Sequence, residues 1–170
     1  MSYCPSDTTS TTSSMVYTPK GDSIAIGDLS LQDGHNPSDA VPWPGNTYII
    51  QKKRSKKSLY SYNGLSMATV GSSNKYTHWL CVESNGYFGF FNKQNNQYLS
   101  FQNDRIQMAS DFGSKELFSP RRHPMGGYLL MVPYGNDTLK QVGILCDGTT
   151  LVARYHAGAI WEFVQISESE

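Results

Sequence analysis

The chain has 170 residues, which fits one domain, or one domain with a tail, and is enough to bury a sizeable core. Its formal net charge is zero, from 14 basic and 14 acidic residues, which argues against a general nucleic-acid binder. Residues 1–45 carry five acidic residues and one basic residue, net −4, so the remaining residues carry +4.

Three cysteines, Cys4, Cys81 and Cys146, are too few and too far apart for a disulfide framework and are typical of a reducing compartment. The first residues lack the basic and apolar segments of a signal peptide. No apolar run approaches the ~20 residues that span a bilayer. We therefore expect a cytoplasmic protein without a membrane span, whose basic run at 52–57 also fits nuclear entry.

An N-terminal extension, residues 1–46, precedes the patterned part of the chain. Residues 5–14 are rich in Ser and Thr and hold no hydrophobic residue, so we predict that they are disordered. Residues 16–31 place apolar residues at short spacing, which fits either a strand pair or an arm laid across the main domain. Residues 33–46, with three prolines and two glycines, are a loop by composition.

Trp43 lies between two prolines in this loop and cannot sit in a helix. It either plugs one end of the domain or lies exposed as a binding aromatic. The plug is favoured because an indole usually finds burial. The second alternative makes Trp43 a candidate binding residue.

From residue 47 onward a pattern of four short strands occurs three times, over about 47–85, 86–126 and 127–167. Each copy opens on a tyrosine, and its fourth strand opens on a bulky aromatic residue. The opening residues are Tyr48, Tyr87 and Tyr128, and the later aromatics are Trp79, Phe118 and Trp161. Such recurrence at intervals of about forty residues predicts an internal repeat.

The second and third strands of each copy carry further landmarks. The second strands centre on Leu59, Leu99 and Leu145, and the third strands share Met67-Ala68, Met108-Ala109 and Val152-Ala153. The turns between them are Asn63-Gly64, Asn103-Asp104 and Asp147-Gly148. These turn residues tolerate the positive φ angles of tight hairpins.

Twelve short antiparallel strands must protect their edges, and closure into a barrel does so. We therefore predict an all-β fold: a single β-trefoil, with a six-stranded barrel capped by three hairpins, after the N-terminal extension. An irregular sandwich is the alternative, but it does not explain why the landmarks come in threes.

The pattern YFGFFNKQNNQYLSF, followed by a Met-Ala strand and a later Trp or Phe strand, resembles the β-trefoil domains of the fascin-like, actin-crosslinking superfamily. The resemblance covers roughly residues 47–167 and concerns the fold. The Gln-x-Trp signature of ricin-B-type lectins is missing, since the matching places read Thr77-His78-Trp79 and Ala159-Ile160-Trp161.

The densest charge in the chain lies in the first hairpin turn. Its cations are Lys52, Lys53, Arg54, Lys56 and Lys57. Five cations on one exposed hairpin would attract phosphate, sulfate or an acidic protein surface. The alternative is a solvated turn, or a partner for the chain's own acidic extension.

Two histidines lie beside arginines: His123 after Arg121-Arg122, and His156 after Arg154. Catalysis needs an acid or a nucleophile beside such a histidine, and the sequence places none there, so we expect exposed loop histidines. The four histidines of the chain do not show zinc spacing, and we expect neither a metal nor a cofactor.

Several tyrosines lie at or near turns, where Tyr with Asn and Gly makes a good glycan or protein contact surface. They are Tyr60, Tyr62, Tyr76, Tyr134 and Tyr155. The alternative is that they belong to the core, which in trefoils also uses tyrosine.

We expect a non-catalytic recognition protein that binds a carbohydrate, an anionic surface or a protein through turn residues, as a monomer or weak oligomer with one site at most. Besides the basic hairpin, the candidate binding residues are Trp43, Tyr134, His123 and Arg154. One alternative is a small enzyme of cyclase or isomerase type, with a pocket between the extension and one barrel end. Its first suspects would be Trp43, His35, His123 and Arg154. Another is a protease inhibitor or an actin crosslinker.

Overall fold

The computed structural model describes residues 40–167. The disorder predicted for 5–14 and the strand pair or arm predicted for 16–31 lie outside the described residues, as does His35. Residues 40–46, which we assigned to the extension, already bond to the strands: Ala40 N donates to Phe163 O (3.2 Å) and Gly45 N to Cys81 O (2.8 Å). The domain boundaries themselves stay a prediction.

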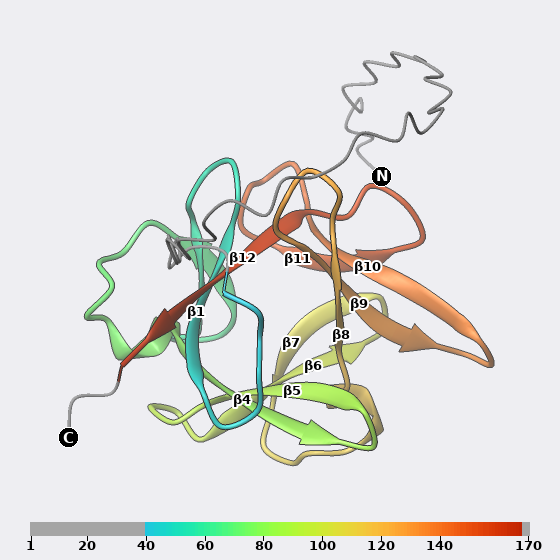
Figure 1. Ribbon diagram of the computed structural model, residues 1–170, viewed down its shortest axis with the longest axis horizontal. Coiled ribbons are helices and arrows are strands. Elements are labelled where there is room, and N and C mark those ends of the chain that lie inside the picture. Colours follow the sequence, from blue (N-terminus) through green and yellow to red (C-terminus); the bar gives the residue numbers. More distant parts are fainter. Residues whose placement is uncertain (1–39, 168–170) are drawn as a thin grey trace, which may run out of the picture. The chain divides into compact units, whose positions relative to one another are not determined.

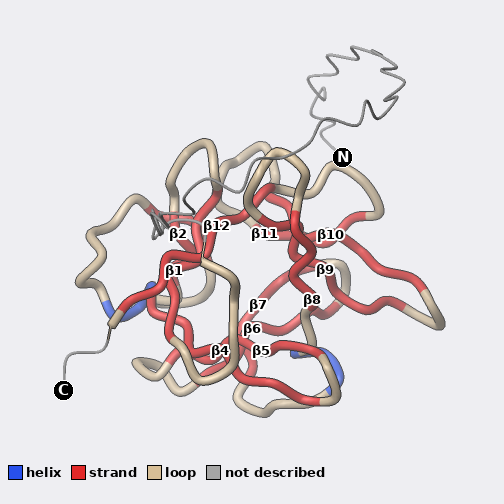
Figure 2. The backbone as a smooth tube through the Cα atoms, viewed as in Figure 1, coloured by secondary structure: helices blue, strands red, loops and turns tan. Residues whose placement is uncertain are grey.

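The described chain is built almost wholly of short strands joined by tight turns (Figures 1 and 2). The strands are β1 (Thr47–Lys52), β2 (Ser58–Tyr60), β3 (Ser66–Ala68), β4 (His78–Ser84), β5 (Tyr87–Asn92), β6 (Gln97–Gln102), β7 (Arg105–Ala109), β8 (Ser119–Arg122), β9 (Tyr128–Tyr134), β10 (Thr138–Ile144), β11 (Leu151–Arg154) and β12 (Ile160–Ile166). Two 3₁₀ turns, η2 (Lys75–Thr77) and η3 (Ser114–Glu116), precede β4 and β8. The prediction of an all-β chain is confirmed for this part.

Antiparallel pairing closes the strands into a ring that leaves no long open edge. The ring β12-β9-β10-β11-β7-β6-β5-β4-β1 closes where β1 pairs with β12, and β2, β3 and β8 are attached to it. A shorter path links β5 to β9 through the Phe88–Phe118 bridge and β8. Along this path β1, β4, β5, β8, β9 and β12 form the six-stranded barrel that the edge argument predicted.

Aromatic side chains from different parts of the chain meet inside the barrel. Phe163 contacts Tyr48, Tyr128 and Phe90, with ring centroids 5.8, 5.4 and 5.6 Å away. All four residues are buried and belong to one hydrophobic core. Because strands from all three groups of four contribute to this core, it forms only when the whole barrel closes.

Two of the predicted landmark residues are wrong, because the true equivalent residue lies at another position along the chain. In the first and third groups the opening tyrosine lies opposite the fourth-strand tryptophan, as Tyr48–Trp79 and Tyr128–Trp161. In the second group the residue opposite Phe118 is Phe88, not Tyr87. Successive strand residues point to opposite faces, so the shift of one residue leaves Tyr87 off the core face.

The third group contains the second correction. Trp79 Nε1 donates to Leu59 O and Trp161 Nε1 donates to Val142 O, each at 3.3 Å. Val142 is therefore the counterpart of Leu59, and it is buried, whereas Leu145 follows the end of β10. The order of the strands therefore recurs three times as predicted, but not every predicted landmark residue is at the equivalent position.

The predicted turn chemistry is confirmed at all three hairpins between second and third strands. Positive φ angles occur at Asn63 (54°), Asn103 (52°), Asp104 (60°) and Gly148 (70°). Asn, Asp and Gly are the residues that adopt this conformation at low cost.

The cysteines differ from one another in state. Cys81 is a buried free thiol whose pKa is raised to about 12 by burial, so it stays protonated and unreactive. Cys146 is disulfide-bonded, which the sparse cysteine pattern did not predict.

The cytoplasmic location stays a prediction. The part of the chain that the structure describes holds no helix with the length and hydropathy of a membrane span.

Candidate binding site

The basic hairpin does not present five free cations. Lys56 pairs with the buried carboxylate of Glu162, which also accepts from Gln51 Nε2 (3.0 Å). Lys53 Nζ donates to Met125 O (2.7 Å), which ties this hairpin to the turn after β8. Two of the five cations thus have partners within the domain, although the Lys56 side chain is still 55% exposed. Lys52, Lys53, Arg54, Lys56 and Lys57 all stay candidates for binding.

Trp43 does not plug the barrel. Its side chain is 65% exposed, so the plug interpretation is wrong. The neighbouring backbone is what the fold uses: Trp43 N donates to Tyr48 Oη (2.9 Å), and that hydroxyl donates to Val41 O (3.1 Å). Tyr48 is the buried aromatic here instead, and Trp43 stays at the surface between two prolines.

Neither His123 nor Arg154 belongs to a group of catalytic side chains among the described residues. His123 Nδ1 accepts from Met125 N (3.2 Å), a contact within its own turn. Arg154 ends β11 and is exposed. Over residues 40–167 no three His, Cys, Asp or Glu side chains come together as metal ligands would.

Tyr134, the remaining candidate, lies in the most developed polar and aromatic cluster of the described chain. It ends β9, where it forms ring contacts with Phe101 (6.1 Å between centroids) on one side and Tyr155 (6.0 Å) on the other. Lys140 Nζ sits 3.4 Å from the centroid of the Tyr134 ring and 4.9 Å from that of Tyr155. The cluster therefore joins β6, β9, β10 and the loop after β11.

Lys140 is the residue that organises this cluster. Its side chain is only 6% exposed, and its ammonium donates to Asp104 Oδ1 at 2.5 Å. The hydrogen bond to Asp104 raises the pKa of Lys140 above its ordinary value, against the opposing effect of burial. A buried, charged ammonium needs both the carboxylate and the ring faces that surround it.

Sequence reasoning missed Lys140 and Asp104 as site residues. Asp104 was assigned only to a turn, and the strand holding Lys140 was placed too late in the chain. One signal was available: Lys140 is two residues before Val142, so it shares the inward face of β10 with a core residue. A lysine in phase with the core predicts a buried partner of opposite charge.

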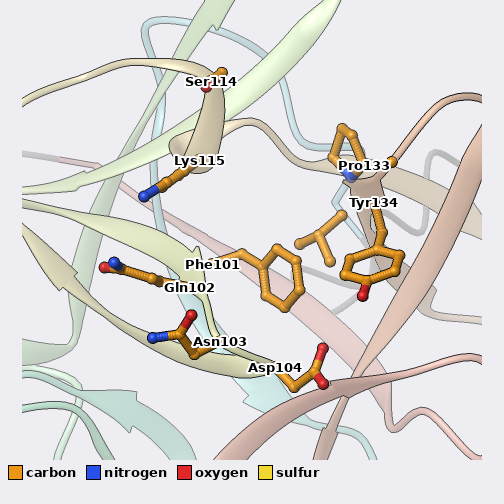
Figure 3. Close-up of a pocket in the computed structure, with 10 residues that line it drawn as sticks. Phe101, Gln102, Asn103, Asp104, Ser114, Lys115, Pro133 and Tyr134 are labelled. Atoms are coloured by element: carbon orange, nitrogen blue, oxygen red, sulfur yellow. The ribbon is translucent and has the colours of Figure 1, made fainter.

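An open pocket of about 650 Å³ lies beside this cluster, between the β6–β7 turn, η3 and the end of β9. In Figure 3 the rings of Phe101 and Tyr134 lie side by side at one end, and Gln102, Asn103 and Lys115 lie at the other. Asp104 lies below the two rings in this view, and its side chain is 62% exposed. We call this hollow the Tyr134 pocket. It offers two aromatic rings, one oriented carboxylate, amide groups and one exposed cation.

A second hollow of about 540 Å³ is lined by Lys75, His78, Lys93 and Gln94 among others. The side chains that line it include no Phe, Tyr or Trp in the described part of the chain. It lacks the combination of ring faces and an oriented carboxylate that marks the Tyr134 pocket.

The tyrosines of the first group form a separate cluster at the surface. Tyr62 contacts Tyr76 (5.0 Å between ring centroids) and Tyr60 (6.2 Å), and it is 50% exposed. Asn95 Nδ2 donates to Ser61 O (2.9 Å) and so braces the turn that carries Tyr62. This cluster has rings but no charged group among them.

Known structures share this fold at low sequence identity. A GlcNAcα1-4Gal-releasing endo-β-galactosidase from Clostridium perfringens matches 72% of this chain with a TM-score of 0.63 and 15% identity. SeviL bound to asialo-GM1 saccharide matches 73% of the chain (TM-score 0.59, 14% identity), and the designed 3-fold symmetric protein ThreeFoil matches 71% (0.59, 17%). The match spans 33% of the endo-β-galactosidase chain but 98% and 99% of the other two.

These likenesses establish a β-trefoil fold. No protein-family description matches the chain, and no curated protein matches it. The structural matches do not single out the fascin-like superfamily, so that resemblance stays a prediction.

Proposed function

We propose that this protein is a non-catalytic recognition protein that binds a carbohydrate in the Tyr134 pocket. The observation that carries the proposal is the oriented set of Phe101, Tyr134 and Asp104. Sugars present an apolar face of C–H groups that packs on aromatic rings, and hydroxyls that donate to a carboxylate. A few fixed polar groups among ring faces are the usual makeup of a small-ligand site.

The buried ammonium of Lys140 adds order to this set. It holds Asp104 through Oδ1, and none of the residues that the structure describes bonds to Oδ2, which leaves that oxygen able to accept from a ligand. Because Lys140 also covers one face of the Tyr134 ring, that ring is fixed before a ligand arrives. Preorganised groups lose less freedom on binding and therefore give more net affinity.

The structural neighbours support the carbohydrate class. SeviL is described as bound to asialo-GM1 saccharide, and the clostridial enzyme as releasing GlcNAcα1-4Gal. The engagement of Lys53 and Lys56 within the barrel weakens the case for an anionic surface as the main partner. Among the described residues no observation favours the enzyme, the protease inhibitor or the actin crosslinker over a binding protein.

A glycan array probed with the intact protein tests this proposal, with the asialo-GM1 saccharide among the printed glycans. We expect binding to at least one neutral glycan and loss of at least about tenfold in affinity in Tyr134→Ala. Tyr62→Ala is the matched control, since Tyr62 is also an exposed tyrosine in contact with another ring, and it should bind as the wild type does. No binding to any glycan, or equal loss in both variants, would contradict the proposal.

A further inference from the structure

Tyr155 extends the aromatic surface beyond the Tyr134 pocket. It is 51% exposed and its ring meets that of Tyr134 at 87° with centroids 6.0 Å apart, yet it does not line the pocket. Tyr134 is 40% exposed and contacts Phe101 on its other side. Three rings therefore follow one another from the pocket outward, with Tyr134 in the middle.

The loop that carries Tyr155 is anchored at several points. Gly158 N donates to Gln141 Oε1 (3.1 Å), and Ala159 N donates to Val142 O (2.9 Å), so the loop is bonded to β10 directly after Lys140. Gly158 also approaches Gln141 so closely that a Cβ there would lie 2.5 Å from the Gln141 Cβ. The position of Tyr155 relative to the pocket is thus set by the strand that holds Lys140.

One buried cation connects the two exposed rings. Lys140 Nζ lies 3.4 Å from the Tyr134 centroid and 4.9 Å from the Tyr155 centroid while it bonds to Asp104. Exposed tyrosines ordinarily gain little from being held in place, whereas a desolvated ammonium against two rings is a favourable contact. The contacts of Lys140 with both rings therefore keep Tyr155 beside Tyr134.

From this arrangement we infer that Tyr155 forms a second sugar subsite, and that the protein recognises an oligosaccharide rather than a single sugar. The inference rests on the proposed function, with one unit in the Tyr134 pocket and the next unit against Tyr155. Neither unit needs a charge to balance Lys140, because its ammonium is already paired with Asp104.

The test compares each oligosaccharide with its own terminal monosaccharide. Both are presented on the same linker in one array, and affinities for the strongest pair are measured by titration with the intact wild type, Tyr155→Ala, Tyr155→Phe and the Tyr62→Ala control. We expect the wild type to bind the oligosaccharide at least about tenfold more tightly than the monosaccharide. Tyr155→Ala should weaken oligosaccharide binding more than monosaccharide binding and so remove this advantage, and Tyr155→Phe should retain it, since the contact is with the ring face.

The outcomes separate the two proposals. Binding to no glycan at all overturns both. If the wild type binds the oligosaccharide and its terminal sugar equally, or Tyr155→Ala weakens both to the same degree, the second subsite is overturned while carbohydrate binding stands. Far-ultraviolet circular dichroism of each variant confirms that it is folded, and the wild-type ratio of oligosaccharide to monosaccharide affinity keeps the proposal falsifiable should the alanine variant not fold.

Discussion

At the scale of single residues, the notable feature is a buried lysine whose partner faces solvent. Lys140 is 6% exposed on its side chain and Asp104 is 62% exposed. The interaction is therefore asymmetric: Asp104 can be solvated without Lys140, but Lys140 has no other described carboxylate within bonding distance. Removing one partner of such a pair leaves the buried group unpaired, which costs more than removing both.

We predict that Asp104→Asn destabilises the protein by about 1–2 kcal/mol in the wild-type background and by close to zero when Lys140→Met is also present. Asparagine keeps the positive φ of 60° that Asp104 adopts, so turn strain does not contribute. Urea unfolding of the wild type, both single variants and the double variant measures the coupling. Additive effects of the two substitutions would show that the ammonium does not depend on Asp104.

The sequence predicted Tyr134 as a candidate but gave no reason to connect it with Lys140 or Asp104. The connection is made by the fold, which brings the β6–β7 turn against β10 from about 36 residues further along the chain. Trp43 was misjudged for a different reason. Burial of an indole is a general tendency, and here the fold binds the backbone of residues 41–43 through the Tyr48 hydroxyl while the indole stays exposed.

At the scale of elements, the hairpin turns are where local sequence decides structure. Asp147 shows how. Its Oδ1 accepts from Thr149 N and Thr150 N, both at 2.9 Å, and its Oδ2 accepts from Thr150 Oγ1 at 2.5 Å. The carboxylate closes the β10–β11 turn through bonds to residues two and three positions ahead, which are available to any chain with this local sequence.

These bonds lower the pKa of Asp147 to about 2, chiefly through the Thr150 hydroxyl and the Thr150 and Thr149 backbone amides. A carboxyl whose pKa is lower in the folded state contributes stability above its unfolded pKa, near 3.8, and loses it as the pH falls toward 2. We predict that wild type is more stable than Asp147→Asn near neutral pH and that the difference shrinks between pH 4 and pH 2. Unfolding by urea at a series of pH values measures it, and a difference that does not change with pH would contradict the assignment.

Strand register was harder to predict than turns. Tyr87 and Phe88 are both aromatic, so composition could not tell which of them points inward, and only the bridge to Phe118 settles the phase. The sequence pattern placed the landmark of the third group at Leu145, a leucine like Leu59 and Leu99 in the other two groups. The hydrogen bond from Trp161 to Val142 O shows that position in the hairpin, not side-chain identity, fixes the equivalence.

At the scale of the whole molecule, the fold followed from the sequence because the strand count and the protection of edges leave few solutions. The site did not, because equivalent places in the three groups hold different chemistry. Counting five residues beyond Leu59, Leu99 and Val142, the place of Asp104 is held by Gly64 and Asp147 in the other hairpin turns. Counting six residues beyond Tyr48, Phe88 and Tyr128, the place of Tyr134 is held by Arg54 and Gln94. Among these equivalent places of the described chain, a carboxylate and an aromatic ring coincide only beside Tyr134, which supports one such site.

The shared core leads to the prediction that the three groups of strands unfold together. Trp79 in the first group and Trp161 in the third are fully buried, and the Phe163 ring packs against Tyr48 and Tyr128, which lie opposite these tryptophans. Two single-tryptophan proteins, Trp43→Phe with Trp161→Phe and Trp43→Phe with Trp79→Phe, report on each group separately. Phenylalanine is tolerable at these places because Phe118 already occupies the equivalent one, although loss of each indole hydrogen bond costs about 0.5–1.5 kcal/mol.

In each protein we expect the fluorescence transition in urea to coincide with the transition in far-ultraviolet circular dichroism. The reason is that β1 pairs with β12 along its whole length, from Thr47–Ile166 to Lys52–Trp161, so the first and last strands leave the barrel together. A group of strands that stayed folded after the β1–β12 pairing was lost would expose the Phe163 cluster and the inner face of β1 to solvent. A fluorescence transition that precedes the dichroism change for one tryptophan would show that its group of strands unfolds independently.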